Sequence, residues 1–189
     1  MRPILVTGFA AFGEHVENPS EQVVHRLCAG AELVAEVLPV SYRRAEARLR
    51  ALIEASEPRA MLLLGLYAGE AFRLERVARN RDEAEARDED GEVRSGRPIS
   101  ACGPAEHAST LPLAAFAEAL TGLSLPVVWS SDAGGFLCNH AFYVARDLQA
   151  QNGRDVPCGF LHLPPLSALP LERQIEGVAA CIEILRVAC

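Results

Sequence analysis

The sequence AMLLLGL, residues 60–66, has no polar side chain over seven consecutive positions. A strand with one face in water usually alternates apolar and polar residues, whereas a strand covered on both faces has a continuous apolar run. We therefore interpret residues 60–66 as a fully buried strand. A sheet built around such a strand needs a layer of helices on each side.

The segments on either side of this strand alternate between strand and helix patterns. Strands alternating with helices at such spacing predict an α/β fold with a mainly parallel sheet covered on both faces. A length of 189 residues fits one domain spanning 1–189. The further strands are expected at 3–8, 31–40, 126–130 and 158–163, and the helices at 18–30, 41–56, 112–122, 138–150 and 171–188.

The first helix has recognisable start and stop signals. Asn18 can cap it, Pro19 suits the first helical position, and Gly30 is expected to end it. The second helix has apolar residues at helical spacing, which predicts one buried face. Those positions are Ala45, Leu49, Leu52 and Ile53.

Residues 66–104 interrupt the alternation. The window 82–92 holds seven acidic residues against one arginine, Arg87, and carries most of the net charge of −7. A charge run without an apolar stripe is typical of a solvated segment. We expect an acidic loop or hairpin arm at about residues 80–97.

The composition excludes several classes of function. All 18 basic residues are arginines, so Schiff-base, P-loop and general-base lysines are absent. The negative net charge argues against a nucleic-acid partner. Neither a membrane-spanning run nor a secretory signal is recognisable, and we expect a cytoplasmic protein.

The six cysteines are expected to be free thiols rather than disulfides. The nearest approach to a metal-site pattern is formed by two cysteines and two histidines whose spacing is wider than in most structural zinc sites. We therefore expect neither a metal nor a cofactor. The four residues concerned are Cys138, His140, Cys158 and His162.

Three residues that could perform catalysis together lie where strands are predicted to end. Cys138 precedes a predicted helix, whose positive end would lower the pKa of its thiol. His162 ends a strand, and Glu75 could orient an imidazole. The residues alone leave other interpretations open: a packing cysteine, a structural histidine and a surface ion pair of Glu75 with neighbouring arginines. His140 is better suited to a structural role.

Four segments resemble those of one enzyme family. They are ILVTGFAAFGEHVENPSEQVV (4–24), LERVARN (74–80), SSDAGGFLCNHAFY (130–143) and GFLHLPPL (159–166). In this order and at these separations they resemble the pyrrolidone carboxyl peptidases, also called pyroglutamyl peptidase I. These cysteine peptidases remove an N-terminal pyroglutamate from peptides.

The resemblance implies a three-layer α/β/α sandwich. It also implies Cys138 as nucleophile, His162 as base and Glu75 as orienting acid, with a small peptide bearing an N-terminal pyroglutamate as substrate. Backbone N–H groups around Cys138 would stabilise the oxyanion. By analogy the chain would form a homo-oligomer, a tetramer in the family. The neutral lactam ring would bind in an apolar slot formed by Phe9, Phe12, Phe136 and Leu137.

The chain also departs from the family pattern. Glu85 stands where the family has an arginine near the active site, and YAGEAF (67–72) lacks a second one. Arg87 is a candidate substitute for the first. Two alternatives stay open: a cysteine hydrolase of another small amide, and a catalytically silent homologue that binds a ligand or partner through its acidic segment.

Overall fold

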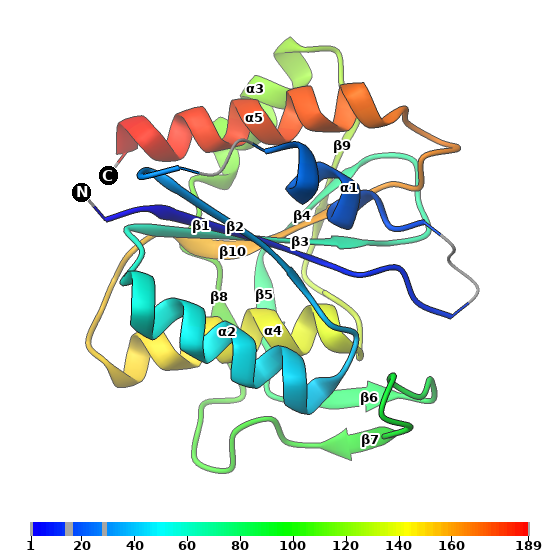
Figure 1. Cartoon of the computed structure of the whole chain (residues 1–189), viewed down its shortest axis with the longest axis vertical. Coiled ribbons are helices and arrows are strands. Elements are labelled where there is room, and N and C mark those ends of the chain that lie inside the picture. Colours follow the sequence, from blue (N-terminus) through cyan, green and yellow to red (C-terminus); the bar gives the residue numbers. More distant parts are fainter. Residues whose placement is uncertain (1, 14–16, 28–29, 189) are drawn as a thin grey trace.

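The computed structural model describes residues 2–13, 17–27 and 30–188. A six-stranded sheet separates two layers of helices (Figure 1), which confirms the predicted α/β/α fold. Its strand order is β2 (Leu33–Leu38), β1 (Ile4–Phe9), β3 (Ala60–Leu66), β10 (Cys158–Leu163), β4 (Phe72–Glu75) and β9 (Val127–Ser130).

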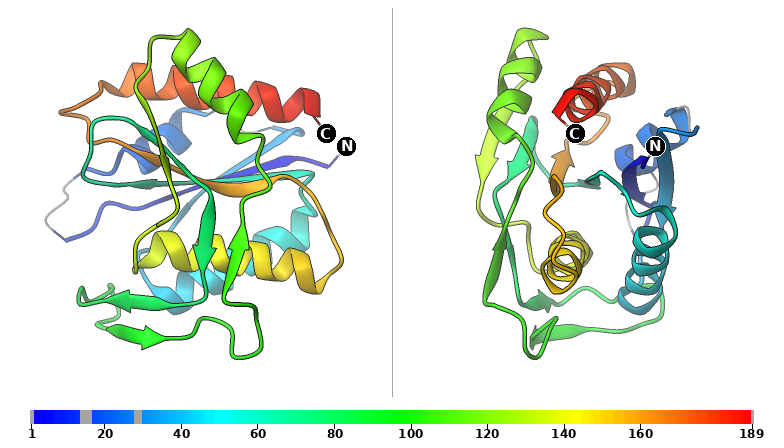
Figure 2. Two further views of the ribbon diagram at one scale, coloured as in Figure 1. Left: turned by 180° about the vertical axis from the view of Figure 1, so that it is seen from behind. Right: turned by 90° about the vertical axis from the view of Figure 1, so that its left-hand side faces the viewer.

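The helices cover both faces of this sheet (Figures 1 and 2). One layer contains α1 (Pro19–Arg26), α3 (Leu113–Gly122) and α5 (Leu171–Ala188), and the other contains α2 (Tyr42–Ser56) and α4 (Leu137–Gln151). Within the described residues, no helix is long and apolar enough to cross a membrane.

The strand β3 contributes to both cores, as its continuous apolar sequence predicts. Leu62 and Leu64 belong to the core beneath α1, α3 and α5. Met61 and Leu63 belong to the core beneath α2 and α4. All four side chains are at most 1% exposed, so both faces of β3 are excluded from solvent.

The predicted start of α1 is correct, but its predicted end is not. The backbone N–H of Ser20 donates to Asn18 Oδ1 at 3.0 Å, and Pro19 is the first helical residue. The helix already ends at Arg26, because Leu27 adopts an extended conformation (φ −72°, ψ 128°). Residues 28–29 lie outside the described residues, and Gly30 forms a bridge with Leu33.

The strand β4 was not predicted, whereas β9 was. β4 lies between β10 and β9, antiparallel to β10 and parallel to β9, so these two strands run against the other four. β9 forms one edge of the sheet, where Val128 and Trp129 are 42% and 49% exposed.

Residues 77–108 form two small antiparallel ladders below the sheet. β5 (Val77–Arg79) pairs with β8 (Glu106–Ala108), and β6 (Asp82–Ala84) pairs with β7 (Arg94–Arg97). The loop between β6 and β7 contacts the start of α2, where Asp88 Oδ2 accepts a hydrogen bond from the Tyr42 N–H at 3.0 Å. Asp82 and Asp88 are buried, whereas the charge run predicted a segment whose acids are solvated. The prediction was therefore wrong for these two residues.

Candidate active site

Cys138 is the second residue of α4, and its sulfur lies against the sheet. A Cβ atom built at Gly65 would be 2.7 Å from Cys138 Sγ and 2.8 Å from Phe160 Cζ. Gly65 of β3 is the register partner of His162 on β10. The absent side chain of Gly65 therefore creates the space for the sulfur, one strand away from His162.

His162 is paired with Glu75 across the antiparallel β10–β4 ladder. Its Nδ1 lies 2.8 Å from Glu75 Oε1, and both side chains are almost completely buried. Phe160 lies directly opposite Glu75 in the register, and His162 lies opposite Arg73. The contact is thus a diagonal cross-strand pair. No strand was predicted at Glu75, so this pairing was not foreseen.

The environment of His162 keeps its imidazole neutral. Burial lowers its pKa and outweighs the opposing effect of the hydrogen bond with Glu75. Because a carboxylate accepts hydrogen bonds, the proton belongs on Nδ1, and Nε2 is left with a free lone pair. His162 can therefore accept a proton through Nε2.

The prediction of a lowered thiol pKa for Cys138 is wrong. Burial, followed by the negative charge of Glu75, raises the pKa of Cys138 to about 12. The desolvation cost of a thiolate at this position exceeds the stabilisation expected from the helix end. Cys138 is therefore a protonated thiol, and any nucleophilic attack needs a base to remove its proton.

Two cavities meet at Cys138. The first has a volume of about 270 Å³ and a mainly apolar lining that includes all four residues predicted to bind the lactam ring. The second, of about 330 Å³, contains Cys138, His162, Arg73, Tyr67 and the loop 132–136. The four predicted residues in the first cavity are Phe9, Phe12, Phe136 and Leu137.

The start of α4 offers backbone donors beside the sulfur. The first N–H groups of a helix have no acceptor within the helix, and no side chain caps α4. The residue before the helix, Phe136, has an extended backbone, and Gly134 adopts a positive φ of 85°. These N–H groups are suitable for stabilising a negative oxygen next to Cys138.

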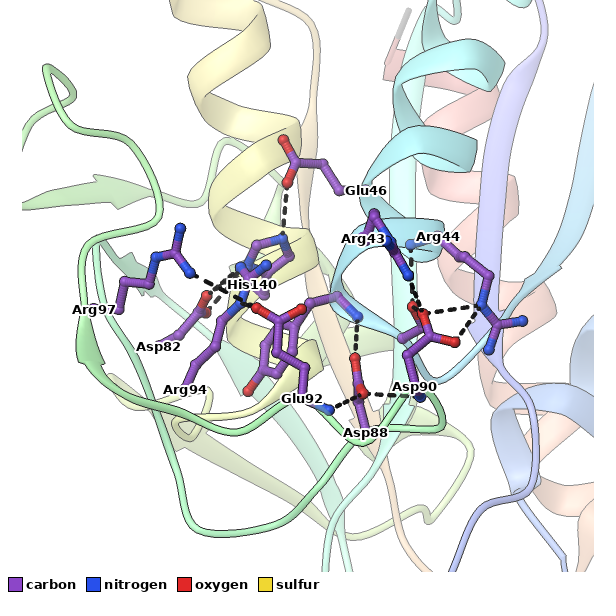
Figure 3. Close-up of polar contacts among 12 residues, drawn as sticks. Arg43, Arg44, Glu46, Asp82, Asp88, Asp90, Glu92, Arg94, Arg97 and His140 are labelled. Carbon is purple, nitrogen blue, oxygen red and sulfur yellow. Dashed lines mark hydrogen bonds and ion pairs between the residues drawn. The ribbon is translucent and has the colours of Figure 1, made fainter.

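A second buried histidine lies two residues beyond Cys138 (Figure 3). His140 Nδ1 is 3.0 Å from Asp82 Oδ2, and its Nε2 is 3.4 Å from Glu46 Oε2. Burial would lower the pKa of His140, but the two carboxylates together raise it. Asp82 also pairs with Arg94 at 2.9 Å. The network joins α4, α2 and the β6–β7 hairpin, in keeping with the structural role expected for His140.

Two residues beside the predicted constellation, Tyr67 and Gly65, were missed in the sequence. An ion pair of Glu75 with a neighbouring arginine was among the interpretations left open, and it is present with Glu75 buried. Arg73 lies 3.0 Å from Glu75 Oε1 through its Nε, Tyr67 stacks against Arg73, and Gly65 faces the sulfur. The alternation of apolar and polar residues in FRLE, residues 72–75, would have identified a strand and placed Arg73 and Glu75 on one face.

Glu85 and Arg87 do not take part in this arrangement. Both are exposed, neither lines the two cavities at Cys138, and Arg87 donates to the Gly91 carbonyl at 3.2 Å. Among the described residues, no group of three or more histidines, cysteines or acids is arranged to hold a metal ion.

Comparison with known proteins gives consistent matches over the whole chain. The family model described as pyroglutamyl peptidase matches residues 2–186. A pyrrolidone-carboxylate peptidase of Gloeobacter violaceus is 34% identical, covering 97% of this chain and 96% of its own length. One from Vibrio vulnificus is 38% identical, covering 100% and 93%.

Solved structures agree with these sequence matches. A mutant pyrrolidone carboxyl peptidase of Pyrococcus furiosus superposes with a TM-score of 0.92 at 28% identity, covering 97% of each chain. The enzyme from Thermococcus litoralis gives a TM-score of 0.90 at 28% identity, covering 97% of this chain and 93% of its own.

Proposed function

Since this chain belongs to the pyroglutamyl peptidase family, we propose that it hydrolyses the amide bond that follows an N-terminal pyroglutamyl residue. Cys138 is the nucleophile, His162 the general base and Glu75 the acid that orients the imidazole. The observation that carries this proposal is the His162 Nδ1–Glu75 Oε1 contact of 2.8 Å at the cavity that also contains Cys138.

The protonation states define the first chemical step. Cys138 begins as a thiol and His162 as a neutral imidazole, so Nε2 takes the thiol proton as the sulfur attacks the carbonyl carbon. The imidazolium that forms is stabilised by Glu75. The first-turn N–H groups of α4 stabilise the oxyanion of the tetrahedral intermediate.

The remaining steps return the residues to their starting states. His162 gives its proton to the leaving amine, the carbon–nitrogen bond breaks, and a thioester to Cys138 remains. His162 then removes a proton from water, which attacks the thioester. Collapse of the second intermediate releases pyroglutamate and restores the Cys138 thiol.

The apolar cavity is suited to the substrate group. A five-membered lactam is neutral, so an apolar lining with a few backbone hydrogen-bonding groups leaves no charge unpaired. Phe12 and Phe136 lie with ring centroids 6.3 Å apart on the wall of this cavity. The second cavity at Cys138, lined by Arg73 and the loop 132–136, is available to the rest of the peptide.

Hydrolysis of a fluorogenic pyroglutamyl amide tests the proposal. The wild-type chain should release the fluorophore from the pyroglutamyl reporter and not from its alanyl or prolyl counterparts. Cys138→Ala should lower the rate by about 10⁴-fold or more. Release from another small amide alone would favour the alternative hydrolase, and complete inactivity of a folded wild-type chain would favour a silent homologue.

Two further properties are part of this proposal. The described cysteines Cys102, Cys138, Cys158 and Cys181 are free, which fits the reducing cytoplasm. The apolar edge at Val128 and Trp129 fits association into a homo-oligomer, which the family analogy implies to be a tetramer. Cell fractionation and size-exclusion chromatography with light scattering test the two expectations.

A further inference from the structure

Arg73 connects the two halves of the candidate site. Its Nε lies 3.0 Å from Glu75 Oε1, and its NH2 group donates to Ser130 Oγ at 2.7 Å and to the Asp132 carbonyl. Glu75 belongs to the half that holds His162. Ser130 and Asp132 begin the loop that leads to Cys138, so one guanidinium fork holds both halves.

The position of Arg73 is itself fixed by packing. Its guanidinium carbon lies 5.3 Å from the centre of the Tyr67 ring, and its side chain is 27% exposed. The Tyr67 hydroxyl donates to the Ala71 carbonyl at 2.7 Å, which anchors the ring over the turn before β4. A planar guanidinium can stack and form its fork at the same time, which an ammonium group cannot.

Several ionisable groups surround His162, and the charge of Arg73 acts on the pKa of its imidazole. Glu75 and Arg73 face the imidazole from β4. The Tyr67 ring packs near it from the segment after β3. Cys138 of α4 and Asp132 line the same cavity. Glu75 Oε2 is buried without a hydrogen-bond partner, so Oε1 makes the contacts to both His162 and Arg73.

We propose that Arg73 is a positioning residue of the peptidase site: it holds the Glu75 carboxylate against His162 and fastens the loop that carries Cys138. This inference rests on the proposed function for its kinetic consequences. It is independent of that function for its effect on the imidazole, since the positive charge of Arg73 also helps to keep the pKa of His162 low.

Arg73→Gln is the decisive variant, and Arg76→Gln is its matched control. The Arg76 side chain is exposed and donates to the Ser130 carbonyl at 3.4 Å, and among the described residues it forms no hydrogen bond or ion pair with Glu75. Arg73→Gln should lower kcat/KM by roughly 10- to 100-fold, because small displacements of reacting groups have effects of this size. Loss of the positive charge should also raise the pKa of His162, so the fall of kcat/KM on the acidic side of its pH profile, the acid limb, should move to higher pH. Arg76→Gln should leave both unchanged.

Arg73→Lys separates charge from geometry and serves if Arg73→Gln does not fold. It should keep the wild-type acid limb while recovering only part of kcat/KM. Equal kcat/KM values for Arg73→Gln and Arg76→Gln would overturn the proposal. So would an acid limb of Arg73→Lys at the same pH as that of Arg73→Gln.

Nuclear magnetic resonance gives a readout that does not need turnover. In the Cys138→Ala background, the His162 imidazole should titrate at higher pH when Arg73→Gln is added, and not when Arg76→Gln is added. An inactive wild-type chain would refute the proposed function while this titration still decides the role of Arg73. An unchanged titration would overturn the effect of the Arg73 charge on His162.

Discussion

Two buried histidines, His162 at the cavity that also contains Cys138 and His140 two residues after Cys138 on α4, have pKa values shifted in opposite directions. Each places Nδ1 within 3.0 Å of a fully buried carboxylate, Glu75 for His162 and Asp82 for His140. Nevertheless the pKa of His162 is lowered and that of His140 is raised.

Two features contribute to the difference: the charge of an arginine beside His162 and a second carboxylate beside His140. Both acids are contacted by an arginine, at 3.0 Å from Arg73 and 2.9 Å from Arg94, and the charge of Arg73 adds to the lowering of the pKa of His162. His140 alone has Glu46 near its other nitrogen, at 3.4 Å. A nearby second carboxylate favours the protonated imidazole, so the pKa of His140 is raised although burial alone would lower it.

The largest expected effect tests this division of roles. His162→Gln should lower kcat by about 10⁴-fold or more, because it removes the proposed proton acceptor of the reaction. His140→Gln should reduce kcat far less at a temperature where the variant is folded. Steady-state kinetics with circular dichroism at the same temperature measure both. Equal losses in two folded variants would remove the distinction between the sites.

The second effect concerns stability on the His140 side. Asp82→Asn leaves His140 and Arg94 buried without their shared anion, and breaking a buried pair typically costs about 3 to 5 kcal/mol. Glu83→Gln, an exposed change on the same strand, should alter the free energy of unfolding by less than about 0.5 kcal/mol. Urea unfolding compares the two, and a similar small change in both would show that the network contributes little.

Gly65→Ala tests the contact between the sulfur and the sheet on the His162 side. The new methyl group would lie 2.7 Å from Cys138 Sγ, so the sulfur or its helix must move. We expect kcat/KM to fall by roughly 10- to 100-fold and the overpacked core to lose about 1 to 3 kcal/mol. Gly122→Ala, where nothing lies within 4 Å, is the control. Wild-type kinetics for Gly65→Ala would contradict the placement of the sulfur.

The two histidines should also give opposite slopes of stability against pH. The raised pKa of His140 means that its contribution is complete below pH 6.5 and is lost as the pH rises through the folded-state value. The lowered pKa of His162 means that stability falls as the pH drops below 6.5, where the unfolded chain binds more protons.

Glu46→Gln sharpens this comparison, because it leaves His140 with one carboxylate, as His162 has. The alkaline decline in stability should then begin at lower pH, while the acid decline stays in place. Unfolding free energies measured between about pH 5 and 9 would show the change, within the range where histidine titrates. An unchanged alkaline decline would mean that Glu46 does not hold the His140 proton.

The smallest effect is expected at Glu85. Its side chain is exposed and does not line the cavities at Cys138, so Glu85→Arg should change kcat/KM by less than about twofold. Arg87→Ala should behave similarly. A large gain in kcat/KM with Glu85→Arg would show that the hairpin carries this position into the site during turnover.

Local patterns were sufficient to predict much of the fold. The predicted strand at 60–66 matches β3, and the helix predicted at 138–150 lies within one residue of α4 at each end. Both depend on the pattern of apolar residues within the segment itself. The strand β4 was missed because it is short and its neighbours, β10 and β9, come from distant parts of the chain.

The resemblance predicted which residues form the candidate site, but the sequence did not predict the electrostatics around them. Cys138, His162 and Glu75 were identified by resemblance, whereas their burial depends on layers that no single segment specifies. The thiol pKa prediction was therefore wrong, since it considered the helix end and not the desolvation. The partners of His140 were missed for the same reason: Glu46 and Asp82 come from separate elements.

Trp129, at the exposed edge of the sheet, gives this molecule an optical probe of its own. It is the single tryptophan of the chain, is 49% exposed and is the register partner of Leu74 on β4. Its neighbour Ser130 accepts the hydrogen bond from Arg73. Indole emission should therefore respond to changes at the Arg73 fork, and quencher access to the ring should fall if the proposed homo-oligomer forms through the β9 edge. One fluorophore, without any label, can follow the site and test the proposed assembly.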